Sequence, residues 1–148
     1  MDLAVVIVAA GRGLRASRGG DMAKQYVPIA GRTVLARTLD VFCRHPRVQA
    51  IQVVIHGDDR AAWAATFDEM PDAQRGLILP AVTGGTTRQA SVLAGLEALE
   101  PLGPQRVLIH DAARPFVDAA LIDQVVSALD HHEGAIPRTC RGGHAETG

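Results

Sequence analysis

The 148-residue sequence predicts an α/β fold in which an open, mostly parallel β-sheet carries helices on both of its faces. Two observations predict this architecture. Short apolar runs rich in β-branched residues end in glycine, proline or a polar turn, as strands buried on both faces of a parallel sheet do. Longer segments between these runs repeat apolar residues with helical spacing. Strands and helices that alternate in this way form right-handed βαβ units, whose ligands bind beyond the carboxyl ends of the strands.

The strand pattern occurs first in the longest apolar run, 3–10, which leads directly into Gly11. The same pattern predicts strands at 48–55, 77–82 and 106–109, and a fifth strand at 134–137.

Helical spacing is clearest in 33–42, where the apolar residues share one face and the pattern stops before Pro46. Three more helices are predicted at 59–68, 87–99 and 118–129, and Asp118 is a suitable N-cap for the last of them.

Composition excludes several classes of protein. Hydrophobic residues make up 47% of the chain and the net charge is −1, which indicates an ordered domain without the basic surface of a nucleic-acid-binding protein. Aromatic residues make up only 3%, so base-stacking platforms are not expected. The longest apolar run is well short of the ~20 residues that span a membrane, and the start lacks a basic leader, so we expect a cytoplasmic protein. Cys43 and Cys140 lie far apart and predict neither a zinc site nor a disulfide framework.

The loop after the first predicted strand combines glycines with several cations. Gly11 and Gly13 match part of a dinucleotide-binding pattern, but the residues that follow do not start a helix. Small residues and cations suit a loop that wraps a triphosphate, with backbone N–H groups and basic side chains sharing its charge. The alternative is a flexible basic surface loop. The cations of this loop are Arg12, Arg15, Arg18 and Lys24.

Two further loops follow predicted strands. Gly84 and Gly85 precede the helix predicted at 87–99, where paired glycines permit close backbone approach and the helix start offers free N–H donors. Asp111 follows the strand at 106–109, where a carboxylate can hold Mg²⁺ against phosphate oxygens. The alternative for Asp111 is an ion pair with Arg114 or a helix cap. Neighbouring His110 either orients this loop or packs in the core, and no role is assigned to the other histidines.

Three motifs in this order resemble the 2-C-methyl-D-erythritol 4-phosphate cytidylyltransferase family. They are AAGxGxR at 9–15 with KQY at 24–26, GGxxRxxSVxxGL at 84–96, and HDAARPF at 110–116. Residues 32–39 also resemble the first helix of that family, and the resemblance extends from residue 3 to 137. It implies a nucleotidyltransferase-type Rossmann-like domain over 1–137 that joins CTP to methylerythritol phosphate and releases pyrophosphate, as a step of isoprenoid precursor synthesis.

The resemblance also implies roles for individual residues. Arg15 and Lys24 would be catalytic and face the phosphates, and Asp111 would hold Mg²⁺. The nucleotide-binding set would comprise Ala9, Ala10, Gly11, Gly13, Gly85, Thr86, Arg88, Ser91, Asp111 and Ala112. A phosphomonoester is already anionic near neutral pH, so the reaction needs cations to offset charge rather than a base to remove a proton.

The sequence departs from the family pattern in two places. Met22 and Ala23 stand where the family usually has a proline before the lysine, which leaves Lys24 less rigidly placed. Residues 138–148 have no strand or helix pattern, and we expect a disordered tail outside the family domain. The codons that can encode residues 138–147 can also encode the segment with which family members continue, if they are read one base further on. The tail is therefore consistent with a frameshift product. The alternative is a truncated chain, and in either case we expect the sheet to be incomplete at its C-terminus and the activity of this chain to be impaired.

Alternative functions remain open at this point. The acceptor could be another sugar-alcohol phosphate such as ribitol phosphate, or the chain could be a nucleotide-binding remnant without catalysis. A nicotinamide dehydrogenase is the more distant alternative. In the family the domain is a homodimer, and a second cyclodiphosphate synthase domain is a further expectation for the original gene.

Overall fold

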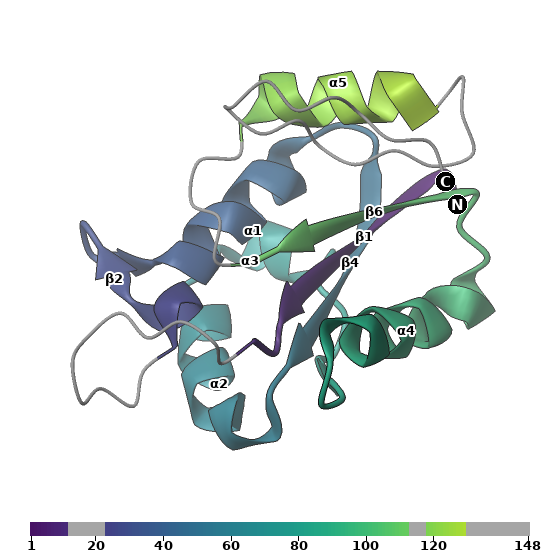
Figure 1. Cartoon of the computed structure of the whole chain (residues 1–148). Coiled ribbons are helices and arrows are strands. Elements are labelled where there is room, and N and C mark those ends of the chain that lie inside the picture. Colours follow the sequence, from purple (N-terminus) through teal and green to yellow (C-terminus); the bar gives the residue numbers. More distant parts are fainter. Residues whose placement is uncertain (12–22, 113–117, 130–148) are drawn as a thin grey trace, which may run out of the picture.

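The structure is a computed structural model, which describes residues 1–11, 23–112 and 118–129. Its centre is a four-stranded sheet of order β5-β4-β1-β6, in which all paired strands are parallel (Figure 1). The strands are β1 (Leu3–Ala9), β4 (Val48–Ile55), β5 (Val82–Thr83) and β6 (Arg106–Asp111). This arrangement confirms the predicted mostly parallel sheet. Because β1 pairs with β4 on one edge and with β6 on the other, its carboxyl end lies in the middle of the sheet.

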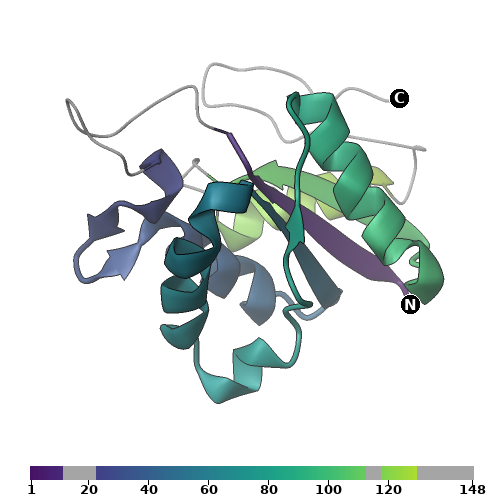
Figure 2. The same cartoon turned by 90° about the horizontal axis from the view of Figure 1, so that it is seen from below.

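The two faces of β1 pack into separate cores. Leu3, Val5 and Ile7 belong to a cluster with residues of α1 (Val34–Arg44) and α5 (Ala119–Leu129). The alternate residues of β1 belong to a second cluster, against which α4 (Arg88–Leu99) packs. Helices therefore cover both faces of the sheet, as Figures 1 and 2 show from two directions. All residues of β1 are buried, which explains why the strand is a continuous apolar run rather than an alternating one.

Side-chain caps fix where three of the helices begin. The Thr33 hydroxyl accepts a hydrogen bond from the Ala36 N–H at 3.0 Å, and Thr87 accepts one from Ala90 at 3.0 Å. Asp118 accepts one from the Leu121 N–H at 2.8 Å, which confirms the predicted N-cap of α5. The remaining helices are α2 (Arg60–Asp68) and α3 (Asp72–Arg75), and short 3₁₀ turns occur at η1 (Lys24–Tyr26), η2 (Gly57–Asp59) and η3 (Glu100–Leu102).

The predicted strand at 77–82 is wrong in its extent. Only Val82–Thr83 forms a regular strand, although Leu77 and Leu79 exchange backbone hydrogen bonds with Ile51 at 2.8 Å each. Between these residues and Val82, the Pro80 carbonyl accepts a hydrogen bond from the Gln52 side-chain amide at 2.8 Å. The fourth predicted strand is in turn longer than expected, since β6 continues to Asp111.

A small hairpin outside the main sheet was not predicted. β2 (Pro28–Ile29) and β3 (Arg32–Thr33) pair antiparallel around Ala30 and Gly31. Both turn residues have positive φ, 53° and 89°, as a tight hairpin turn requires. Alanine rarely adopts such a φ, so no turn was predicted at these residues.

Cys43 is a free thiol, as expected, and lies partly buried on α1. Burial, with a smaller contribution from nearby Asp40, raises the pKa of Cys43 to about 11. The side chain is therefore protonated at neutral pH and is a poor nucleophile or metal ligand. Cys140 and the predicted strand at 134–137 lie outside the described residues. No helix in the described ranges is long and apolar enough to cross a membrane.

Gly95 lets α4 approach the sheet closely, because a Cβ at this position would lie 2.6 Å from Val6 Cγ1 and 3.0 Å from Val54 Cγ2. Both valines are fully buried and stiff at χ1, so neither can move aside cheaply. We expect Gly95→Ala to lower the free energy of unfolding by about 1–3 kcal/mol, despite the better helix propensity of alanine. Urea denaturation followed by circular dichroism measures the change.

The control is Gly76→Ala, since a Cβ at Gly76 meets nothing within 4 Å and its φ of −64° suits alanine. This substitution should be neutral or stabilise the chain by up to about 1 kcal/mol. Equal effects of the two substitutions would contradict the close approach of α4.

Candidate functional site

Backbone hydrogen bonds bring the loops that follow the strands together at the carboxyl edge of the sheet. The Gly84 N–H, after β5, donates to the Ile55 carbonyl at the end of β4 at 2.8 Å. The Ala112 N–H, after β6, donates to the Val8 carbonyl of β1 at 2.9 Å. The segments around 9–11, 84–88 and 111–112 therefore meet at one edge, as parallel topology predicts.

Gly84 is the point of closest approach between two of these segments. A Cβ on Gly84 would clash with the Ser91 hydroxyl and would lie 2.9 Å from the Ala10 Cβ. The loop after β5 can therefore rest on the end of β1 only because residue 84 has no side chain. Gly85 is similarly restricted, because its Cβ would clash with Ala90. Both glycines are thus explained by packing, and that packing places the start of α4 beside the end of β1.

Arg88 and Asp111 form an ion pair across this edge. The Arg88 Nε lies 3.2 Å from Asp111 Oδ1, so the pair joins the first residue of α4 to the last residue of β6. Their side chains remain 59% and 35% exposed, so solvent reaches the pair and its contribution to stability is small. The sequence alternative joined Asp111 to Arg114 instead, but residue 114 lies outside the described ranges.

The position of Arg88 is electrostatically unfavourable for the free protein. Arg88 is the first residue of α4, whose first turn carries no acidic side chain. The helix dipole disfavours a cation there by about 0.3–1 kcal/mol and favours an anion by a similar amount. Asp111 partly offsets this cost. A phosphorylated ligand could use both the free N–H groups of the first turn and the guanidinium.

Gln25 is a site residue that the sequence analysis did not single out for a role. Its buried side-chain amide donates to the Ala9 carbonyl at 2.7 Å and lies 3.5 Å from the Gly11 carbonyl. Gln25 follows Lys24 in η1, so this contact ties the turn that bears Lys24 to the end of β1. The sequence signal for this contact was weak, namely the position of Gln25 next to Lys24, because its partners are backbone atoms 14 and 16 residues away.

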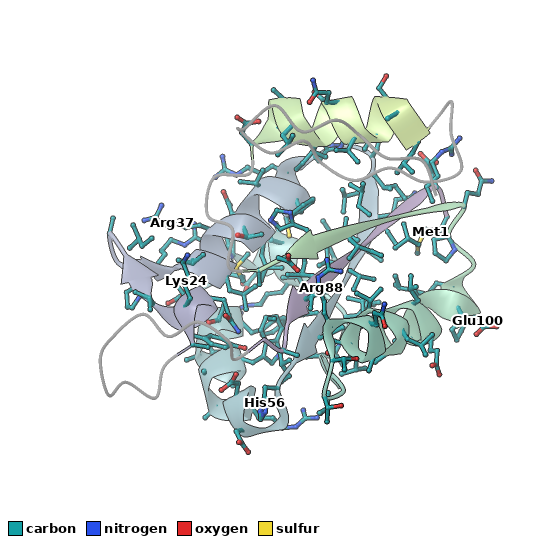
Figure 3. The ribbon with its side chains drawn as sticks, viewed as in Figure 1. Met1, Lys24, Arg37, His56, Arg88 and Glu100 are labelled. Atoms are coloured by element: carbon teal, nitrogen blue, oxygen red, sulfur yellow. The ribbon has the colours of Figure 1, made fainter. Side chains whose placement is uncertain are left out.

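The predicted site residues that the structure describes lie at the end of β1, on η1, around the start of α4 and at the end of β6. Ala9 ends β1, and Ala10 and Gly11 follow it, while Lys24 is exposed on η1 (Figure 3). Gly85, Thr86 and Arg88 are exposed around the start of α4. Ser91, within α4, and Ala112, directly after β6, are buried. Arg15 and Gly13 lie outside the described residues.

The described residues contain no cluster of three or more His, Cys, Asp or Glu side chains that could hold a metal ion by themselves. Asp111 is a single, partly exposed carboxylate at the end of β6. Mg²⁺ commonly binds proteins through one or two carboxylates and completes its shell with substrate phosphates and water. The Asp111 carboxylate therefore fits a divalent cation that a nucleotide carries.

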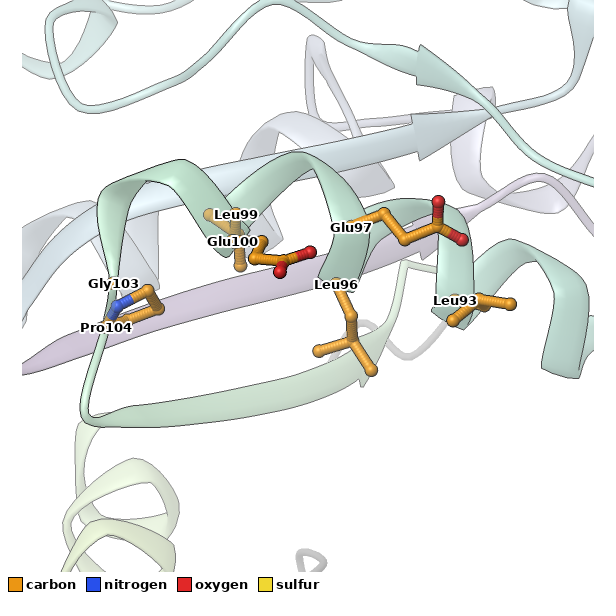
Figure 4. Close-up of a pocket in the computed structure, with 7 residues that line it drawn as sticks. All are labelled: Leu93, Leu96, Glu97, Leu99, Glu100, Gly103 and Pro104. Atoms are coloured by element: carbon orange, nitrogen blue, oxygen red, sulfur yellow. The ribbon is translucent and has the colours of Figure 1, made fainter.

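A surface groove lies elsewhere on α4 (Figure 4). It is lined by residues of the C-terminal half of the helix and of the turn after it, so it lies toward the opposite end of α4 from Arg88. The lining residues are Leu93, Leu96, Glu97, Leu99, Glu100, Gly103 and Pro104. Their mostly apolar side chains do not suit a phosphorylated ligand.

Comparisons with known proteins agree with this geometry. Residues 3–140 match the model of the family described as IspD: 2-C-methyl-D-erythritol 4-phosphate cytidylyltransferase. The bifunctional enzyme IspD/IspF of Rhodopseudomonas palustris strain HaA2 is 56% identical over 135 residues, which cover 90% of this chain and 31% of that protein. The chain thus spans about a third of the length of the curated relatives it matches.

Solved structures are similar as well. The 4-diphosphocytidyl-2C-methyl-D-erythritol synthase of Anaerococcus prevotii is 33% identical with a TM-score of 0.66, and the match covers 88% of this chain and 52% of that one. Rv0371c of Mycobacterium tuberculosis, solved as a complex with manganese, has a TM-score of 0.63 over 90% of this chain and 62% of its own. At 21% identity, Rv0371c is similar in fold alone. The family match, which extends over residues 3–140, establishes that the chain belongs to the IspD family.

Proposed function

We propose that the chain is the CTP-binding part of a cytidylyltransferase that joins CTP to 2-C-methyl-D-erythritol 4-phosphate and releases pyrophosphate. The observation that carries the proposal is the Arg88–Asp111 pair at the carboxyl edge, beside the glycine loop that reaches Ala10. This arrangement offers a cation, a carboxylate and the N–H groups of a helix start to one ligand. Its charges suit a nucleotide triphosphate accompanied by a divalent cation better than a dinucleotide such as NAD.

In the proposed mechanism the acceptor phosphate attacks the α-phosphorus of CTP, and pyrophosphate leaves. The acceptor is already an anion, so the protein supplies orientation and positive charge rather than a general base. Lys24, and Arg15 by family resemblance, offset charge on the phosphates. Arg88 and Ser91 would lie around the cytosine and ribose together with Gly85 and Thr86, and backbone groups of 9–11 and Ala112 would complete the nucleotide site.

Asp111 is the residue that would hold Mg²⁺, and the bound ion would offset charge that develops on the phosphate oxygens. Binding would require the Asp111 carboxylate to be shared with Arg88 or released from it, because Oδ1 already accepts the Arg88 Nε–H. Arg88 therefore holds the carboxylate in place before the nucleotide arrives. The choice of Mg²⁺ rather than another divalent cation is part of the proposal.

The alternative acceptors considered from the sequence are not favoured, since the family description names 2-C-methyl-D-erythritol 4-phosphate and the Anaerococcus prevotii protein is a 4-diphosphocytidyl-2C-methyl-D-erythritol synthase. A cytoplasmic location and a homodimer remain predictions. The domain limits of 1–137 and 138–148 also remain predictions, because the structure does not describe residues 130–148.

Pyrophosphate release tests the proposed reaction. The chain with Mg²⁺ should release pyrophosphate only when CTP and methylerythritol phosphate are both present, and Asp111→Asn should slow the release by about 10²-fold or more. Ribitol phosphate and the other nucleoside triphosphates are the substrate controls. Stabilisation by CTP without release under any of these conditions would contradict transfer and support a nucleotide-binding protein without catalysis.

The proposed roles of Lys24 and Arg88 predict different nucleotide profiles. Lys24→Ala should weaken CTP binding by about 10- to 100-fold, the loss of one charge-assisted contact, and should affect CMP much less because CMP lacks the β- and γ-phosphates. Arg88→Ala should weaken CTP and CMP by similar factors, because its proposed contact lies near the base and ribose. Isothermal titration calorimetry measures both.

Arg44→Ala is the matched control, since Arg44 is an exposed arginine in the last turn of α1 and pairs with Asp40. It should bind both nucleotides as the native chain does. An identical loss of CTP and CMP binding in Lys24→Ala would contradict the phosphate role.

A further inference from the structure

The buried side chain of Gln25 connects two parts of the proposed site. Gln25 is only 4% exposed, and its Nε2 donates to Ala9 at 2.7 Å while lying 3.5 Å from the Gly11 carbonyl. Its backbone belongs to η1, where the Tyr26 N–H donates to Ala23 at 3.0 Å and the Val27 N–H to Lys24 at 3.2 Å. One side chain thus joins the turn that bears Lys24 to the segment that ends β1.

This contact also fixes a peptide orientation. The described peptide bonds are trans, and in a planar trans peptide the C=O and the following N–H point in opposite directions. When the Ala9 carbonyl accepts from Gln25, the Ala10 N–H must point away from Gln25. The Ala9–Ala10 peptide, part of the backbone that family resemblance places at the nucleotide, is therefore oriented by the buried Gln25 side chain.

The chemistry of the contact requires an amide. Two carbonyl oxygens face the Gln25 Nε2, and a glutamine NH₂ carries two donors. A glutamate of the same length would have no donor when ionised and one donor when protonated. A methionine would keep the length and volume without any donor.

We propose that Gln25 is a positioning residue that holds the Ala9–Ala10 peptide and Lys24 in one arrangement for the nucleotide phosphates. The inference rests on the proposed CTP site and adds to it a residue outside the predicted binding set. It predicts that removal of the Gln25 side-chain amide weakens CTP binding by more than the accompanying loss of folding stability explains.

Gln52 provides a matched control. It is likewise buried, at 2% exposure, and its Nε2 donates to the carbonyls of Val53 at 3.1 Å and Pro80 at 2.8 Å. It lies within β4 opposite Val6, three residues before the strand ends. Gln52→Met therefore removes the same kind of buried contact without touching the turn of Lys24.

The experiment compares the native chain with Gln25→Met, Gln52→Met and Gln25→Glu by thermal unfolding and by CTP titration with Mg²⁺. Both methionine variants should unfold at lower temperature, but only Gln25→Met should bind CTP at least about 10-fold more weakly. Gln25→Glu should bind CTP weakly at pH 8 and approach the native affinity, compared at the same pH, as the pH is lowered to 5 and the carboxyl gains a proton. This variant also keeps the test decisive if Gln25→Met does not fold.

Native CTP affinity in Gln25→Met, or an equal loss in Gln52→Met, would overturn the inference. So would a Gln25→Glu variant whose affinity relative to the native chain does not change with pH.

Failure of the proposed function itself has a different result, namely no CTP binding by the native chain. Hydrogen exchange of the Tyr26 and Val27 amides then decides the role of Gln25 in holding the turn. Faster exchange in Gln25→Met but not in Gln52→Met supports that role, and equal exchange in all chains overturns it.

Discussion

The site depends on the burial of β1 on both faces and its pairing along both edges. A strand in this position cannot shift its register without exposing a row of apolar side chains or breaking two ladders. Its carboxyl end is therefore a fixed reference point. A backbone hydrogen bond ties the residue after β6 to β1, and another ties the loop after β5 to the end of the neighbouring strand β4. Ligand-binding residues from distant parts of the sequence can then share one location, as the Arg88–Asp111 pair does.

Lys24 and Arg88 at this edge are exposed and Asp111 is partly exposed, so the hydrophobic core does not explain their placement. Arg88 and Asp111 contribute little to folding as a solvent-accessible pair, and Arg88 opposes the dipole of its own helix. A binding site explains this placement, since Asp111 would attract the divalent cation of a bound nucleotide and Arg88 would donate to its base or ribose. The glycines serve a different purpose, because Gly84 lets the loop after β5 approach the end of β1 and Gly95 lets α4 approach the sheet.

Much of the architecture was predictable because β1 is a continuous apolar run and α1 repeats apolar residues with helical spacing. The convergence of three loops was also predictable, since it follows from parallel topology once the strands are placed. The hairpin at Ala30–Gly31 was not, because alanine with a positive φ carries no turn signal. Contacts that depend on tertiary packing were equally hidden. Gln25 finds its carbonyl partners on β1, and His45, to which no role was assigned, lies buried with its Nε2 2.5 Å from Asp123 Oδ1 on α5.

Backbone amide chemical shifts measured during a CTP titration with Mg²⁺ test the central claim most directly. If the carboxyl edge is the nucleotide site, the largest changes should occur together at 9–11, 84–91 and 111–112, in addition to Lys24. Binding of CTP with its largest changes along the groove from Leu93 to Pro104, and none at the strand ends, would contradict the account.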